Sequence, residues 1–246
     1  MSITRSTIVE TLHAALEPND SVFALWLEGA DAAERADEYS DIDVWVDTAD
    51  GKEDETLKAI EEALSNIGQV DFKHLRKGHP HPKIRQMFFH LAGTPEYLII
   101  DVSVQSHSRV FWYTKGHPDH VITLLFDKSG VIEYREPVDG ELKQKIHERK
   151  TEIKKTFYFY QTWVKKALNR GDFLEGTYYY NQMVLEPLVE LIRIRYKPQK
   201  REFYLKHATR DLPASVTKRL EPLFKVHSVR DIENNLLLAN QWFDEL

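Results

Sequence analysis

The sequence contains no cysteine among its 246 residues. Disulfide bonds and cysteine-ligated zinc are therefore excluded, and nothing in the composition indicates secretion. No apolar run approaches the roughly 20 residues that a membrane-spanning helix needs, and residues 1–16 have the pattern of an amphipathic helix instead of a signal peptide. We therefore expect a cytoplasmic protein with no membrane partner.

The chain also lacks the strongly basic stripe that is typical of nucleic-acid-binding proteins, so nucleic acid is not expected as a partner. Its charge is unevenly divided. Residues 139–246 carry 20 Lys and Arg against 15 Asp and Glu, whereas residues 1–138 carry 13 basic and 24 acidic residues. This change in charge, from a net of −11 to a net of +5, marks a domain boundary between residues 138 and 139.

The most informative stretch that is present is SDIDVWVD, residues 40–47. A strand alternates its side chains between two faces, so Asp41 and Asp43 share one face while Ile42 and Val44 take the other. Two neighbouring carboxylates repel each other unless a cation lies between them, and Mg²⁺ prefers carboxylates, water and phosphate oxygens. The pattern therefore indicates phosphoryl or nucleotidyl transfer, although a DxD by itself is also common at solvated strand ends.

Two further strands strengthen this interpretation. The apolar run at residues 21–29 ends in Gly29, which predicts a buried strand followed by a tight turn. The run at residues 96–105 places Asp101 in the middle of an apolar strand, where an unpartnered carboxylate is costly. Together Asp41, Asp43 and Asp101 would form a cluster able to bind two metal ions about 3.5–4 Å apart.

The order of elements predicts an α+β protein. A helix is expected at residues 54–68, two strands within 83–104, and a hairpin at 121–134 that turns at residues 128–130. Beyond Pro137 the apolar period is helical throughout. The helices expected in this half are 140–169, 173–195, 213–226 and 229–245.

The motifs follow one another in a definite order: a strand, a Gly with a small residue after it, a loop, Ser-Asp-Ile-Asp, and an Asp on a distant strand. This order resembles that of the nucleotidyltransferase superfamily of DNA polymerase β. It is most similar to the antibiotic nucleotidyltransferase branch, by motif over residues 20–105 and weakly beyond. The resemblance implies a minimal nucleotidyltransferase domain with a mixed β-sheet at 1–138 and a C-terminal helical bundle at 139–246.

The resemblance also implies roles for individual residues. Asp41 and Asp43 would bind both metal ions, and Asp101 would bind one ion or act as the base. Gly29 and Ala30 would hold the triphosphate, with Ser40 as a further nucleotide-binding candidate. One difference from the family is that Ala30 and Asp31 stand where Ser and often Arg are usual, so a hydroxyl contact is lost and a negative charge is added.

The implied activity is magnesium-dependent transfer of a nucleoside monophosphate, AMP from ATP, to a hydroxyl of a small molecule such as an antibiotic. Two Mg²⁺ ions and a nucleoside triphosphate would be required, and a homodimer is left open. The alternatives are a regulator that transfers AMP to another protein and a degenerate, noncatalytic nucleotide binder. The uneven charge suits a site for Mg-nucleotide and a cationic acceptor, or it is solvated surface.

The helical half offers less specific signals. Its aromatic residues, including Phe157 and Phe159, favour bundle core over a ligand pocket. Glu186 and Glu190 lie one helical turn apart, where either is a candidate base, although Glu186 precedes Pro187 and marks a kink equally well.

Overall fold

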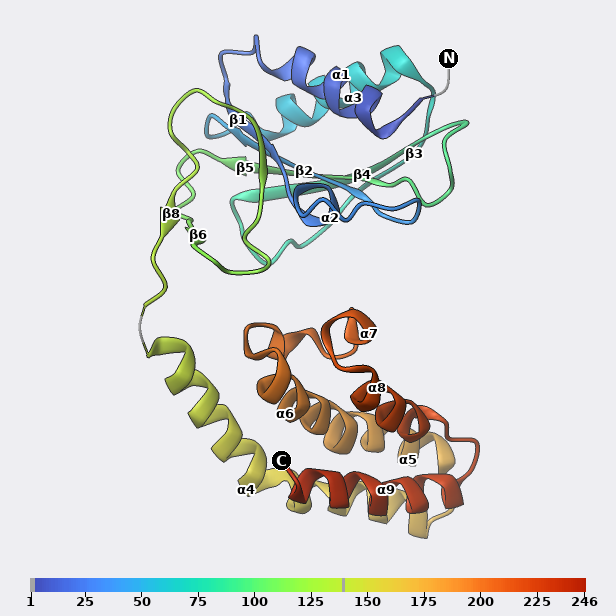
Figure 1. The fold of residues 1–246 in the computed structure, drawn as a ribbon. Helices are drawn as coiled ribbons and strands as arrows, with labels where there is room; N and C mark the ends of the chain where they lie inside the picture. Colours follow the sequence, from blue (N-terminus) through green and yellow to red (C-terminus); the bar gives the residue numbers. More distant parts are fainter. Residues whose placement is uncertain (1–2, 139) are drawn as a thin grey trace. The chain divides into compact units, whose positions relative to one another are not determined.

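The computed structural model describes residues 3–138 and 140–246. The chain divides into two compact units, Met1–Pro137 and Val138–Leu246, one residue from the boundary expected. Each unit has its own buried apolar cluster. Strands dominate the first unit and helices make up the second, so the predicted α+β class is confirmed (Figure 1).

The N-terminal unit is built on a six-stranded mixed sheet with the order β3-β4-β5-β2-β1-β7. Its strands are β1 (Val22–Leu27), β2 (Ile42–Thr48), β3 (Val70–Leu75), β4 (Ile84–Leu91), β5 (Ile100–Ser106) and β7 (Thr123–Asp127). The helices α1 (Arg5–Leu16) and α3 (Glu53–Ile67) cover one face of this sheet, and the short helix α2 (Gly29–Ala32) follows β1 (Figure 1).

Strands β2 and β5 form the centre of the sheet and run parallel. Ile42 pairs with Ile100 and Val44 with Val102, and all four side chains are buried. Ile8 of α1 and Ile60 and Leu64 of α3 belong to the same apolar cluster. Because strand side chains alternate, the odd-numbered residues of both strands must lie on the other face of the sheet.

Several strands differ from the sequence prediction. β7 pairs antiparallel with β1, and β8 (Tyr134–Arg135) pairs parallel with β6 (Tyr113–Thr114), so the predicted 121–134 hairpin is wrong. The Asp127 carboxylate accepts hydrogen bonds from the backbone N–H groups of Ser129, Val131 and Ile132, which turns the chain away from the sheet. β3 was not predicted, because the apolar–polar alternation of VDFKHL is short and ends at Lys73-His74, and five of its six residues are exposed.

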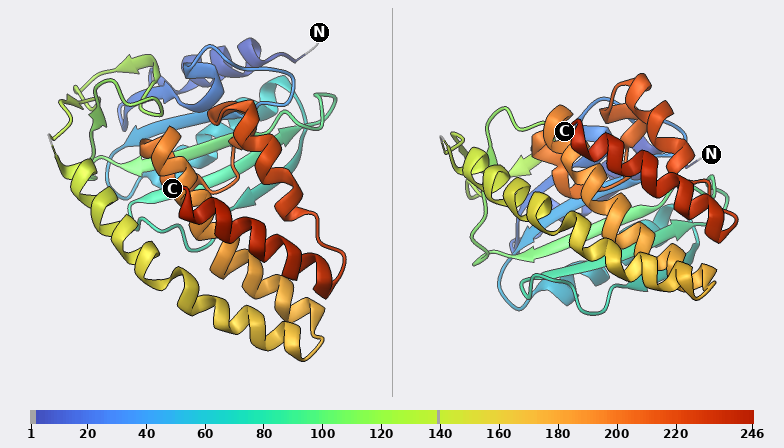
Figure 2. Two further views of the ribbon diagram at one scale, coloured as in Figure 1. Left: turned by 60° about the horizontal axis from the view of Figure 1, so that its bottom comes forward. Right: turned by 90° about the horizontal axis from the view of Figure 1, so that it is seen from below.

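The helical unit contains α4 (Glu141–Asn169), α5 (Phe173–Tyr180), α6 (Glu186–Tyr196), α7 (Ala208–Asp211), α8 (Ala214–Leu220) and α9 (Val229–Asp244). In both views of Figure 2, α5 lies beside α4. The rings of Phe157 in α4 and Phe243 in α9 stack at 3.7 Å between centroids, which joins these two helices. The helix expected at 173–195 is interrupted by a π-helical turn at Asn181–Leu185, just before Pro187. Proline lacks the N–H that an unbroken α-helix needs at this position.

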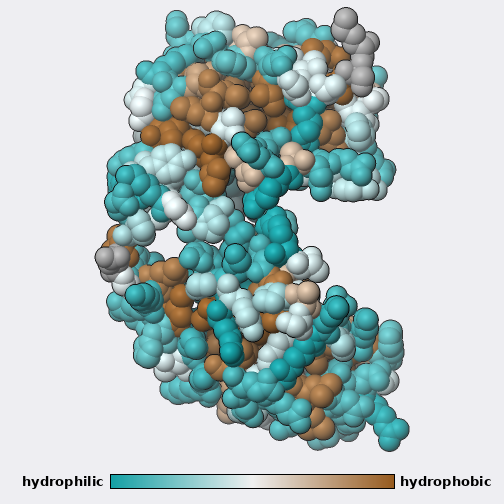
Figure 3. Space-filling model, in the orientation of Figure 1, coloured by the Kyte–Doolittle hydropathy of each residue, from teal (hydrophilic) through white to brown (hydrophobic). Residues whose placement is uncertain are grey.

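The helix expected at 213–226 is likewise shorter, since a 3₁₀ turn at Glu221–Phe224 containing Pro222 follows α8. On the face seen in Figure 3 the surface of the helical unit is mainly hydrophilic. Across the described residues, none of the helices combines the length and apolar character that crossing a membrane requires.

Candidate metal and nucleotide site

The two strand carboxylates predicted from the sequence lie side by side. Asp43 of β2 and Asp101 of β5 are register partners on adjacent parallel strands. Their neighbours on both strands are buried on the opposite face, so the two acids share the face that α1 and α3 leave uncovered. A position for Asp101 on the other face would have separated the acids by the thickness of the sheet.

Gly29 brings its backbone against Asp43. Its φ of +67° lies in the left-handed region, which a residue with a Cβ adopts at a cost. A Cβ added to Gly29 would stand 1.9 Å from Oδ2 of Asp43. Two features therefore require glycine at this position: the left-handed backbone conformation, and the Asp43 carboxylate that packs over it.

Asp41 and Ser40 precede β2, which begins at Ile42. Asp41 is exposed, and its charge acts on both Asp43 and Asp101. The Ser40 hydroxyl donates to Oδ1 of Asp37 at 2.7 Å and accepts from the Asp37 N–H at 3.1 Å. In this structure the hydroxyl therefore orders its own loop, and nucleotide binding by Ser40 stays a prediction.

Two carboxylates of the site have raised pKa values. The pKa of Asp43 is raised to about 6, first by burial and then by the charges of Asp101, Asp41, Glu28 and Asp31. The pKa of Asp101 is also raised, again mainly by burial, while a hydrogen bond from Gln86 opposes the rise. Repulsion between like charges therefore raises both pKa values, but loss of solvent around the carboxylates raises them more.

Gln86 of β4 holds Asp101. Its amide nitrogen donates to both carboxylate oxygens, at 2.8 and 2.9 Å. Its amide oxygen accepts from Nη1 of Arg76 at 2.9 Å, which fixes the orientation of the amide. Sequence reasoning missed Gln86 and Arg76, because only the pairing of β3, β4 and β5 brings them to Asp101.

The donor set fits a hard divalent cation, since carboxylate oxygens at the surface of a sheet are what Mg²⁺ takes from proteins. As the side chains stand, residues 3–138 and 140–246 contain no group of three His, Asp or Glu arranged to hold an ion. Each Asp101 oxygen accepts one hydrogen bond from Gln86 and keeps a further lone pair, so the carboxylate can bind a metal ion while the amide holds it. The metal-binding roles of Asp41, Asp43 and Asp101 remain predictions.

Glu28 adds a fourth acid beside the pair. It accepts hydrogen bonds from the Tyr113 hydroxyl and from Nε1 of Trp26, the latter at 3.2 Å. The Trp26 Nε1 also donates to the Tyr113 oxygen at 2.8 Å. These contacts fix Glu28 at the end of β1, next to the Gly29 turn.

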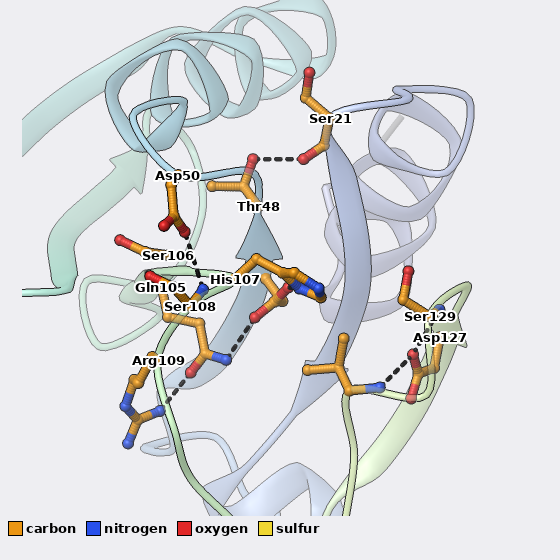
Figure 4. A network of polar contacts seen from close by, with 12 residues as sticks. Ser21, Thr48, Asp50, Gln105, Ser106, His107, Ser108, Arg109, Asp127 and Ser129 are labelled. Atoms are coloured by element: carbon orange, nitrogen blue, oxygen red, sulfur yellow. Dashed lines mark hydrogen bonds and ion pairs between the residues drawn. The ribbon is translucent and has the colours of Figure 1, made fainter.

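A second polar cluster follows Asp43 along the same face of β2. Asp47, only 1% exposed, accepts from Nε2 of Gln105 at 2.7 Å and pairs with Nδ1 of His107 at 2.6 Å. Figure 4 shows the Gln105 side chain beside that of Arg109, whose guanidinium donates to the Gln105 oxygen. Arg109 in turn lies 5.5 Å from the ring of Trp45. The Asp47 carboxylate and the Gln105 amide both have partners, which indicates a structural role for this pair. Nε of Arg109, in contrast, is buried without a hydrogen-bond partner among the described residues.

In the helical unit, Nε and Nη2 of Arg149 donate hydrogen bonds of 2.8–3.0 Å to the Glu190 carboxylate. This pairing argues against Glu190 as a base. Glu186 is exposed and lines a cavity of about 330 Å³. Phe157 is buried in the bundle core, as expected, whereas Phe159 is 63% exposed.

The mixed sheet thus presents paired carboxylates beside a glycine turn, which is the arrangement expected from the sequence motifs. No model of a known protein family matches this chain, and no curated protein matches it. Among solved structures it is similar to an aminoglycoside 6-adenyltransferase from Bacillus subtilis. That likeness has a TM-score of 0.37 and 14% sequence identity, and it covers 99% of this chain and 88% of the other.

Proposed function

We propose that this protein is a magnesium-dependent nucleotidyltransferase that moves a nucleoside monophosphate, AMP from ATP, onto a hydroxyl of a small molecule such as an antibiotic. The observation that carries the proposal is the in-register pair Asp43 and Asp101 on parallel strands, with Asp43 packed against the left-handed turn at Gly29.

At the α-phosphorus, the proposed reaction forms one P–O bond and breaks another, and the hydroxyl proton passes to a base. The acceptor hydroxyl oxygen attacks the α-phosphorus, the bond from that phosphorus to the bridging oxygen breaks, and pyrophosphate leaves. Bound Mg²⁺ would supply the positive charge that stabilises the leaving pyrophosphate and acidifies the hydroxyl. Asp41, Asp43 and Asp101 would hold the metal, and Gly29 and Ala30 would meet phosphate oxygens with their backbone N–H groups.

A carboxylate of the cluster would take the hydroxyl proton, and we assign this role to Asp101. Asp101 would take the proton directly or through water. Because its pKa must be low when it binds metal, activation of the hydroxyl by the metal would contribute more than the strength of the base. The Gln86 amide orients its two oxygens, so the base stays aligned with the metal position.

The test is pyrophosphate release with Mg²⁺ and ATP across a panel of acceptors: aminoglycosides, lincosamides and a protein-only control. Release that depends on a small-molecule acceptor and disappears in Asp43→Asn supports the proposal. Transfer of labelled AMP to protein alone would favour the protein-modifying alternative. Nucleotide-dependent thermal stabilisation without any release would favour the noncatalytic binder.

A further inference from the structure

Arg5 lies in the first turn of α1, outside the strands that carry the acids, and its side chain contacts the loop that leads to Asp41. Its Nε and Nη2 atoms donate to the two Asp31 oxygens at 3.2 and 2.6 Å. Nη1 donates to the Ser40 carbonyl at 2.5 Å and Nη2 to the Asp41 carbonyl at 2.6 Å. One guanidinium thus joins both ends of the loop between α2 and β2.

The position of Arg5 is not explained by the helix that carries it. Thr4 is the N-cap of α1, and the first turn holds no acidic residue. A cation there is opposed by the helix dipole. Arg5 gains its stabilisation from the loop instead, and its side chain is only 25% exposed.

The same contacts account for the unusual Asp31. An acid in this turn adds a negative charge near Asp43 and raises its pKa. The bidentate pair with Arg5 compensates that charge locally, and the planar guanidinium, unlike an ammonium, has enough donors to hold the two carbonyls as well.

We propose that Arg5 is a positioning residue for the metal site: it fixes the backbone of Ser40 and Asp41 against the Asp31 turn, so that the Asp41 carboxylate starts from a defined place beside Asp43. The inference rests on the proposed function, because it assigns Arg5 to the metal-binding loop. The loop itself has further internal bonds, from the Arg35 N–H to the Ala30 oxygen and from the Ser40 N–H to the Asp37 oxygen, but these join only near neighbours.

The test measures Mn²⁺ affinity of the intact protein by electron paramagnetic resonance, with Mn²⁺ as the probe for Mg²⁺. Arg5→Lys keeps the charge and loses the planar fork, and we expect it to weaken Mn²⁺ binding about tenfold, as loss of a group that orients metal ligands does. Arg5→Gln removes the charge. Electrostatics alone would make this variant bind Mn²⁺ more tightly, whereas lost positioning makes it bind more weakly.

Arg35→Lys is the matched control, since Arg35 lies on the same loop, is exposed, and makes no side-chain hydrogen bond or ion pair with the described residues. It should bind Mn²⁺ as the wild type does. Hydrogen exchange of the unliganded protein gives a second readout: the Glu34, Arg35 and Ser40 amides should exchange faster in Arg5→Lys and keep their rates in Arg35→Lys.

The outcomes separate the two proposals. Wild-type affinity in both Arg5→Lys and Arg5→Gln, with Mn²⁺ binding abolished by Asp43→Asn, overturns the role of Arg5 and leaves the proposed function standing. Tighter binding in Arg5→Gln also overturns it. A wild-type protein that binds no Mn²⁺ removes the proposed function and this inference together.

Discussion

At the scale of single residues, the site is held by close contacts that leave little room for change. Gly29 meets Asp43, Gln86 holds both oxygens of Asp101, and the Ser40 hydroxyl is bound to Asp37. Each contact links a backbone conformation or a neutral side chain to an acid. Charge alone would drive these acids apart, so packing and hydrogen bonds keep them in place.

Gly29→Ala should destabilise the protein and abolish metal binding, because the new Cβ would overlap Oδ2 of Asp43. Gly51→Ala is the matched control. Its φ of +81° imposes a similar backbone penalty, but a Cβ there meets nothing within 4 Å. We expect urea denaturation to show a loss of about 1 kcal/mol for Gly51→Ala and more for Gly29→Ala, with Mn²⁺ binding lost only in the latter. Equal effects of both variants would contradict the packing role of Asp43.

The raised pKa of Asp43 predicts how stability depends on pH. The unfolded chain releases this proton near 3.8, and the folded, unliganded protein near 6. Between these values the folded state binds more protons than the unfolded state, so the contribution of Asp43 to stability falls as pH rises through this window. Asp43→Asn should therefore be more stable than the wild type at pH 8, by about 1 kcal/mol after solvent screening, and equal to it below pH 4.

Asp37 serves as a control of opposite sign. Its pKa is lowered, chiefly by the Ser40 hydroxyl, so Asp37→Asn should lose stability above pH 4. Urea denaturation of both variants from pH 3.5 to 8 provides the measurement. A stability difference for Asp43→Asn that does not change with pH would show that this carboxyl titrates normally.

In the wild type, Mg²⁺ must displace the Asp43 proton, so metal affinity should fall below about pH 6.

At the scale of elements, the packing of α4 against α9 supports the helical unit. The Phe157 and Phe243 rings stack nearly parallel, at 2° between their planes, and Phe157 is only 1% exposed. Phe157→Ala should cost about 3–5 kcal/mol in the free energy of unfolding, since it removes a buried aromatic ring and leaves a cavity. Phe159→Ala, two residues along the same helix and 63% exposed, should stay within about 0.5 kcal/mol of the wild type. Chemical denaturation compares the two, and similar losses would refute this assignment of the core.

At the scale of the whole molecule, the two buried clusters share no residue. Leu64 belongs to the cluster of the N-terminal unit and Val189 to that of the helical unit, and both are fully buried. We expect Leu64→Ala to accelerate hydrogen exchange in β2 and β5 and to leave the core amides of α4 and α9 nearly unchanged, with the reverse for Val189→Ala. Uniform acceleration across both units by either variant would show that the chain unfolds as one cooperative body.

The sequence by itself determined the elements that carry the acids. Alternation in residues 40–47 and 96–105 is a local property, so the strands and the faces of Asp43 and Asp101 could be predicted, and Gly29 was found by its place after an apolar run. Arg5, Gln86 and Arg76 could not be found in this way. The Arg5 contact to Ser40 spans 35 positions, and Gln86 reaches Asp101 only through the register of β4 on β5. Pairing partners and register are set by the packing of the whole sheet, which is also why β7 joined β1 instead of forming the expected hairpin. The tertiary structure alone decided which neutral and basic side chains hold the acids.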